Sequence, residues 1–217
     1  MTDSVRKTIE ALEKNRFSVV YLEKKEEVKD AVLSFINKGD VVSNGGSVTL
    51  DECGVKEALR TGDYVYLDRD KEGLTREDIE EIYRKTFSAD VFLTSTNAIT
   101  QNGELYNVDG NGNRIAAMMF GPKKVIVVAG VNKIVADIDE AAKRVKTVAA
   151  PKNCKRLGIE NYCAETGSCL SLRDNENSSI CDGCAADRRI CSGYLISAFQ
   201  KNKDKFKIIL VNEKLGY

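Results

Sequence analysis

Short apolar runs alternate with amphipathic segments along the first 150 residues of the chain. β-branched and aromatic residues dominate the runs at 17–22, 40–43, 64–67, 90–94 and 124–129, and such runs are typical of strands in a buried sheet. Apolar residues recur at helical spacing over 4–15, 25–37, 49–59, 75–87, 114–120 and 138–149. This alternation predicts an α/β fold with an open, mostly parallel sheet that helices cover.

Two stretches depart from the alternation. Gln101-Asn-Gly103 separates short apolar runs at 98–100 and 105–108, which predicts a β-hairpin. The helix over 138–149 is expected to end before Pro151. From 151 to 193 the periodicity disappears, and 206–211 then predicts another strand of the same sheet. We therefore expect a single domain, 1–217, with an irregular cysteine-rich excursion at about 151–193.

The charge balance narrows the possible functions. Lysine plus arginine and aspartate plus glutamate number 33 each, so no net charge favours nucleic acid or a membrane surface. No apolar run approaches the roughly 20 residues that span a bilayer, and the amino terminus lacks the apolar core of a signal peptide. A cytoplasmic location is the expectation. The chain has no histidine, which excludes histidine-based triads and zinc sites.

A glycine-containing loop, Asn44-Gly-Gly-Ser47, lies between a predicted strand and a predicted helix. Glycines let a backbone approach a ligand closely, and amides at the start of a helix favour anions. The same residues also fit a tight turn in which Ser47 or Thr49 caps the helix. Both interpretations stay open.

A second loop, Asp109-Gly-Asn-Gly-Asn-Arg114, has a more unusual composition. It is not the dinucleotide-binding fingerprint, because Ile115 occupies the position of the third glycine. Asp109 supplies a carboxylate, and Arg114 a fork of donors that suits a carboxylate or phosphate. The alternative is a solvated loop in which these two side chains pair. The predicted ligand-binding residues are Gly45, Gly46, Ser47, Thr49, Asn97, Asp109, Gly110, Asn111, Gly112, Asn113 and Arg114.

Most of the cysteines lie in the irregular excursion. Cys181-Asp-Gly-Cys184 has the spacing that lets two thiolates meet one metal, and further cysteines can complete the site. The candidate metal ligands are four of the five residues Cys163, Cys169, Cys181, Cys184 and Cys191. Zinc and an iron–sulfur cluster are the possible cofactors. Disulfides and plain buried thiols are the alternatives, although a cytoplasmic location disfavours stable disulfides. Cys154 is expected to be peripheral, and Cys53 to belong to the core.

Several segments together resemble one known family. They are Asn44-Gly-Gly-Ser-Val-Thr-Leu50, Thr96-Asn-Ala-Ile-Thr100, Asn107-Val-Asp-Gly-Asn-Gly-Asn-Arg114 and Phe120-Gly-Pro-Lys-Lys-Val-Ile-Val-Val128. On these residues the chain resembles the LUD-domain, or lactate-utilisation protein, family, and the similarity continues through the cysteine segment to Tyr217. The resemblance implies a fold similar to ribose-phosphate isomerases and CoA transferases. It also implies bacterial operons that oxidise lactate to pyruvate alongside iron–sulfur partner proteins.

Three functional hypotheses follow. The first is a lactate-utilisation component that binds a small anionic metabolite, a carboxylate or phosphate, and carries a redox or metal-binding cysteine tail. The second is an isomerase- or acyl-transferase-like enzyme acting on a phosphorylated sugar or CoA ester, with Asp109 as the catalytic candidate and Glu52 or Glu104 as substitutes. The third is a non-catalytic module that docks an iron–sulfur partner.

Overall fold

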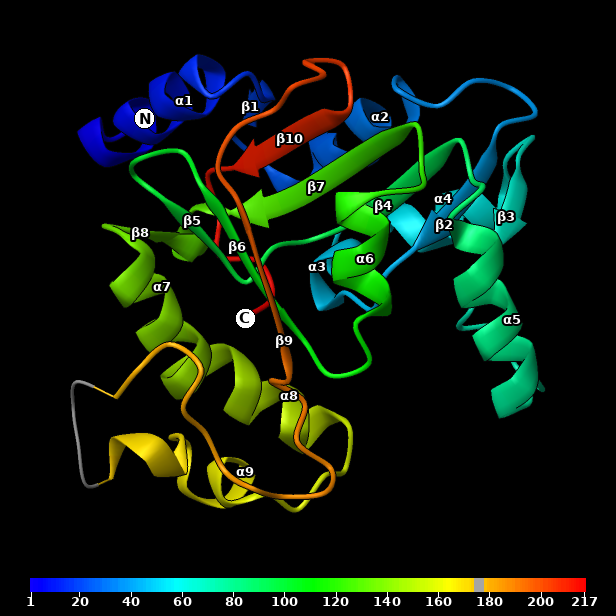
Figure 1. Ribbon diagram of the computed structural model, residues 1–217. Helices are drawn as coiled ribbons and strands as arrows, with labels where there is room; N and C mark the ends of the chain where they lie inside the picture. The colour runs from blue at the N-terminus through cyan, green and yellow to red at the C-terminus, as the bar shows by residue number, and fades with distance from the viewer. Residues whose placement is uncertain (174–177) are drawn as a thin grey trace.

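The computed structural model describes residues 1–173 and 178–217. Its main sheet has the strand order β1-β10-β7-β4-β2-β3, and every neighbouring pair is parallel (Figure 1). The strands are β1 (Ser18–Leu22), β2 (Val41–Asn44), β3 (Val65–Leu67), β4 (Val91–Thr94), β7 (Lys124–Gly130) and β10 (Phe206–Val211). The predicted α/β fold with a mostly parallel sheet covered by helices is confirmed.

Side chains of the central strand β7 alternate between two cores. Val125 and Val127 pack into a cluster with α1 (Asp3–Lys14) and α6 (Asn113–Met119). Ile126 and Val128 pack into a second cluster on the opposite face. That face is covered by α2 (Val28–Leu33), α3 (Val48–Glu52) and α4 (Val55–Thr61), and η1 (Lys25–Glu27) leads directly into α2. Because both faces of β7 are buried, its sequence is a continuous apolar run after Lys124.

The helix predicted over 49–59 is two helices, α3 and α4. Gly54 between them has φ 65°, a left-handed conformation that a continuous helix does not allow and that glycine adopts at low cost. The prediction of one helix was therefore wrong at this residue. The helix predicted over 75–87 is α5 (Arg76–Thr86), and a Thr75–Asp78 capping box begins it.

A second, smaller sheet lies beside the first. Its order is β8-β5-β6-β9, formed by β5 (Ala98–Thr100), β6 (Leu105–Asp109), β8 (Ile134–Val135) and β9 (Gly193–Ser197). The antiparallel β5–β6 pair is the predicted hairpin. Ile99 and Leu105 face the main sheet, whereas Ala98 and Tyr106 face α7 (Ile138–Arg144). The small sheet is thus a middle layer between the large sheet and the helices below it (Figure 1).

The helix that begins at Ile138 continues beyond Pro151. It passes through a π-helical segment, η3 (Val145–Ala149), into α8 (Ala150–Arg156). A proline inside a helix clashes with the carbonyl four residues earlier, and the wider π turn gives the ring room. The expectation that the helix ends before Pro151 was wrong for this reason.

The remaining elements are short. They are η2 (Val131–Lys133), α9 (Tyr162–Thr166) and η4 (Leu170–Leu172). The segment after α8 packs against α8 and rejoins the small sheet at β9; residues 174–177 of the predicted excursion lie outside the described residues. Within the described ranges, none of the helices has the length and apolar character that a membrane span requires.

Candidate functional site

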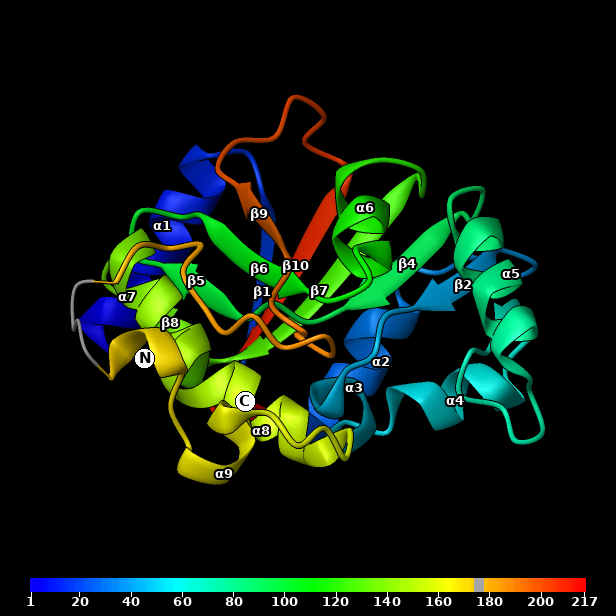
Figure 2. The ribbon, with the colours of Figure 1, turned by 60° about the horizontal axis from the view of Figure 1, so that its bottom comes forward.

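A cleft of about 300 Å³ opens at the carboxyl ends of the parallel strands. One wall comes from the loops that follow β2, β4 and β7, and the other from α8, Ile190 and Tyr217. Figure 2 shows the C-terminus between α3 and α8. In open α/β sheets, the edge formed by the carboxyl ends of the strands is where ligands usually bind. The cleft therefore occupies the expected place for a small-molecule site.

The two predicted glycine loops meet in this cleft. A side chain at Gly45 would lie 3.0 Å from Cγ and Cδ of Arg114, so the first loop packs directly on the second. Gly46 has no heavy atom within 4 Å of the position its Cβ would take. The predicted residues that line the cleft are Gly46, Ser47, Thr49, Asn97, Asp109, Gly110, Asn111, Asn113 and Arg114. Gly45 instead packs behind Arg114, and Gly112 begins α6 in a left-handed conformation.

Arg114 is fully engaged by the protein itself. Its Nη1 donates to the Ser95 carbonyl at 3.2 Å and to Asn107 Oδ1 at 2.7 Å. Its Nη2 donates to Asn97 Oδ1 at 3.0 Å and to the Val108 carbonyl at 2.7 Å. Burial lowers its pKa, against the opposing effect of nearby Asp109. The fork predicted to hold a ligand is therefore a brace that ties the loop after β4 to β6.

Asp109 also has a structural task. Its Oδ2 accepts hydrogen bonds from the backbone N–H groups of Arg114 at 2.9 Å and Ile115 at 3.3 Å, at the start of α6. The other carboxylates considered as catalytic groups do not line the cleft. Glu104 bonds to Thr100 in the hairpin, and Glu52 accepts the Gly216 N–H at 2.7 Å.

Lys133 is the most buried of the basic cleft residues that the sequence interpretation missed, which also include Arg69 and Arg156. Only 2% of it is exposed, and its Nζ donates to Ser95 Oγ at 2.7 Å and to Thr49 Oγ1 at 3.2 Å. Burial, together with the charges of Arg144 and Arg114, lowers its pKa from the ordinary 10.5 to about 7. An amine with this pKa can exchange a proton near neutral pH. The only feature of the sequence that could have indicated Lys133 is its position shortly after a buried strand.

Positive charge dominates the cleft although the whole chain is neutral. Among its described lining residues, the cationic side chains are Arg69, Arg114, Lys133 and Arg156, and the only carboxylate is that of Asp109. The Arg69 guanidinium lies 4.8 Å from the centre of the Tyr83 ring. Arg156 donates from Nε to the Tyr217 hydroxyl at 2.7 Å. Three arginines against one carboxylate make the cleft attractive to anions, and Lys133 adds a further positive charge in its protonated form.

A second feature lies on the far side of α8. An almost closed void of about 20 Å³ is bordered by both apolar and charged side chains and is lined by five thiols, Cys154, Cys163, Cys169, Cys184 and Cys191. These cysteines come from α8, α9 and the irregular segment before β9. Cys181, one of the predicted ligands, is exposed and does not line the void, whereas Cys154, predicted to be peripheral, does.

The thiols approach one another without being bonded. Cys163 Sγ lies 3.8 Å from Cys154 Sγ, and all described cysteines are free thiols. Burial, together with the neighbouring Cys154, raises the pKa of Cys163 to about 12. As they stand, no three thiols or carboxylates of the described residues are grouped closely enough to hold a metal ion. Cys53 lies in the core, as predicted, and burial raises its pKa to about 11.

A comparison with protein families identifies the family of almost the whole chain. The model of the LUD domain family matches residues 5–211. The chain belongs to the LUD domain family. This family is associated with lactate utilisation. No curated protein matches the chain.

One solved structure has a similar fold over almost the whole chain. A DUF162 family protein from Deinococcus radiodurans is 12% identical, with 96% of each chain covered and a TM-score of 0.52. At that identity the likeness concerns the fold alone. The eIF2B beta structure from Chaetomium thermophilum is 19% identical over 52% of this chain and 43% of that one, with a TM-score of 0.35. A similarity this low bears on neither fold nor function.

Proposed function

We propose that this LUD-domain protein binds a small anionic metabolite, a carboxylate or a phosphate, in the cleft at the carboxyl ends of its strands. The observation that carries the proposal is the charge of that cleft, with three arginines and the titrating Lys133 against one carboxylate in a neutral chain. A volume of about 300 Å³ suits a metabolite rather than a macromolecule.

The cationic groups divide into two kinds. Arg114 is committed to holding the loops, so it contributes charge but no donor. Arg69 and Arg156 border the cleft, and Lys133 lies within it. We assign these last three to direct recognition of the anion, with the hydroxyls and amides of the two loops completing the contacts.

The family's association with lactate utilisation makes lactate and pyruvate the first metabolites to test. In this role the protein supports the oxidation of lactate to pyruvate, together with iron–sulfur partner proteins that the family resemblance suggests. Both acids carry one carboxylate, which a guanidinium fork recognises well.

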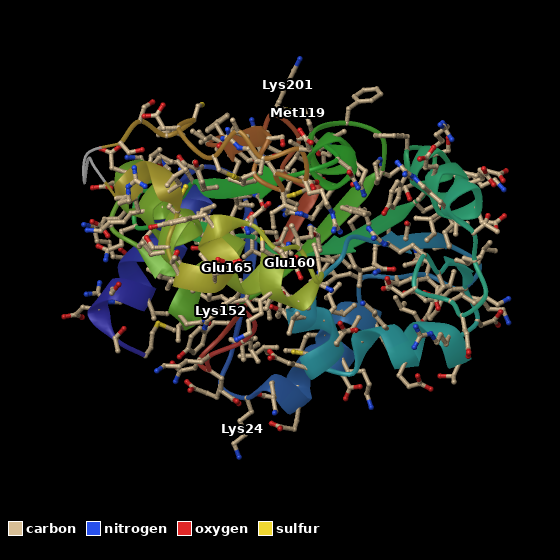
Figure 3. All side chains as sticks on the ribbon, turned by 90° about the horizontal axis from the view of Figure 1, so that it is seen from below. Lys24, Met119, Lys152, Glu160, Glu165 and Lys201 are labelled. Atoms are coloured by element: carbon tan, nitrogen blue, oxygen red, sulfur yellow. The ribbon has the colours of Figure 1, made fainter. Side chains whose placement is uncertain are left out.

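Isothermal titration with L-lactate, pyruvate, inorganic phosphate and a sugar phosphate tests the proposal directly. We expect one of these anions to bind at a single site. Replacing Arg69 or Arg156 by Gln should weaken its affinity by about tenfold each, since one charge-assisted hydrogen bond contributes roughly 1.5 kcal/mol or more. Lys152→Gln is the matched control, because Lys152 lies on the outer surface of α8, away from the cleft (Figure 3). Equal weakening in the control, or no binding of any anion, would refute the proposal.

The contact between Lys133 and Ser95 favours a second candidate, an acyl-transfer enzyme. With a pKa near 7, the amine can take the hydroxyl proton of Ser95, whose Oγ lies 2.7 Å away. The oxygen then attacks the acyl carbon of a thioester, the C–S bond breaks, and Lys133 returns the proton to the departing thiolate. This arrangement moves the catalytic candidate from Asp109 to Ser95 and Lys133.

Mass spectrometry distinguishes the two candidates. Incubation with acetyl-CoA, or with a fluorophosphonate probe, should add one acyl or phosphonyl group to Ser95 in the enzyme. The Ser95→Ala variant should remain unmodified under the same conditions. If the wild-type protein also remains unmodified while it binds an anion, the acyl-transfer candidate is excluded and the binding function stands.

A further inference from the structure

The cysteine-lined void is a candidate metal centre separate from the basic cleft. We infer that four of its five thiols hold a thiophilic metal, either one zinc ion or an iron–sulfur cluster. Cys163, Cys184 and Cys191 are the three ligands that come from α9 and the irregular segment, and Cys154 or Cys169 completes the set. This inference rests on the void and does not depend on the proposed anion site.

The spacing of the closest sulfurs suits a shared metal. Zinc–thiolate bonds of about 2.3 Å at tetrahedral angles place two ligating sulfurs about 3.8 Å apart. Cys154 Sγ and Cys163 Sγ are 3.8 Å apart. The void of about 20 Å³ has room for one small occupant, which favours a single ion over a cluster. Cys184 and Cys191 lie outside helices and strands, so they can draw inward when a metal binds.

A buried hydroxyl provides a second observation. Tyr106 is 1% exposed and lines the void, and its hydroxyl has no hydrogen-bond partner among the described residues. A buried hydroxyl without a partner costs roughly 1–3 kcal/mol, so such groups usually indicate an absent partner. A metal-bound thiolate or sulfide in the void would supply the missing acceptor.

Polar groups around the void suit thiolates. Arg189 donates from Nε to Cys191 Sγ at 3.3 Å, and Ser171 donates from Oγ to Cys169 Sγ at 3.4 Å. Four thiolates with a divalent ion carry two negative charges. The positive charges of Arg189 and Lys146, which both line the void, compensate these negative charges. Asp182 also lines the void and adds one negative charge. Hydrogen bonds of this kind orient metal ligands and tune them.

Metal analysis of the full chain, purified anaerobically with a reductant, tests the inference. We expect close to one equivalent of zinc per chain, or iron with acid-labile sulfide and a brown colour. Zinc identifies a single ion, and iron with sulfide identifies a cluster. Protein that contains neither metal, and that does not take up Zn²⁺ or Co²⁺ stoichiometrically after reduction, overturns the inference.

Substitutions locate the ligands. Cys163→Ser should reduce bound metal at least tenfold, whereas Cys181→Ser and Cys53→Ser should leave it unchanged, because these two thiols lie outside the void. Comparing Cys154→Ser with Cys169→Ser identifies the fourth ligand. Full metal content in Cys163→Ser would overturn the assignment.

Alkylation of the wild-type protein keeps the test valid if a variant does not fold. In the metal-bound protein, iodoacetamide should label Cys181 quickly and the four ligands slowly, and a chelator should make the ligands reactive. Equal protection of the void thiols before and after chelation would show that burial alone shields them and would count against a metal.

Discussion

Replacing Lys133 by Met should stabilise the protein while it removes the cleft's innermost cation. In the unfolded chain the amine titrates near 10.5, whereas in the folded protein its pKa is about 7. Each pH unit of this difference corresponds to about 1.36 kcal/mol, so at pH 7 folding an ordinarily charged lysine into this position costs about 4 kcal/mol.

The substitution also has a cost. The hydrogen bonds from Nζ to Ser95 and Thr49 are lost, at about 1 kcal/mol each. Met has a similar length and fills the space of the lysine stem. The expected net gain at pH 7 is therefore about 2 kcal/mol in the free energy of unfolding.

The pH dependence identifies the cause. Between pH 7 and 10.5 the unfolded chain binds a proton at Lys133 that the folded protein does not, so the stability of the wild type rises with pH. Below pH 7 both states hold the proton, and this contribution no longer changes. The Met variant has no titrating group at this position. Its excess free energy of unfolding over the wild type should therefore be largest near and below pH 7 and should shrink as the pH approaches 10.

Urea denaturation followed by circular dichroism, at intervals from pH 6 to 10, measures the difference. The free energy of unfolding is plotted against pH for the wild type and for the variant. Subtracting one curve from the other removes the contributions of the cysteines and tyrosines, which titrate equally in both proteins. The reasoning is refuted if the variant is less stable at pH 7 or if the two stability curves run parallel. Anion affinity, measured by titration calorimetry at pH 7, should fall in the same variant.

Three further substitutions test the construction of the cleft. Arg114→Lys should destabilise the protein by about 3 kcal/mol, because a lysine cannot satisfy the four acceptors of the guanidinium, and chemical denaturation measures this loss. Gly45→Ala should cost about 1–3 kcal/mol, since the new methyl would meet Arg114 at 3.0 Å; an unchanged thermal midpoint would contradict this contact. Asp109→Ala should lower the free energy of unfolding by about 1 kcal/mol, because the first N–H groups of α6 lose their acceptor. The same change should strengthen anion binding, since it removes the carboxylate of the cleft. Weaker binding in calorimetry would show instead that Asp109 contacts the ligand.

Much of the fold could be predicted because local patterns decide it. The apolar runs of β7 and β10 are buried on both faces, and their period needs no tertiary information. The Gln101-Asn-Gly103 turn selects the β5–β6 hairpin in the same local way. The prediction missed the break at Gly54 and the continuation past Pro151, because helical spacing of apolar residues does not reveal a left-handed glycine or a π-helical turn.

The candidate site was predicted only in part. The two glycine loops are local signals, and they do meet in the cleft. The hydrogen bonds of Arg114 to the protein could not be predicted, because its acceptors on the loop after β4 and on β6 become neighbours only when the strands assemble. Lys133 could not be singled out, since its lowered pKa arises from burial and from cations distant in sequence.

By itself, the sequence determined which segments form strands and helices, and it placed polar glycine loops and a dense group of cysteines between them. The tertiary structure decided which of those residues share a site. It moved Cys181 outward and brought Cys154 into the void, and it concentrated positive charge in one cleft of a neutral chain. The physical reason is that burial and charge at a site depend on neighbours far apart in the chain, whereas strand and helix formation depends mainly on neighbours within a few residues.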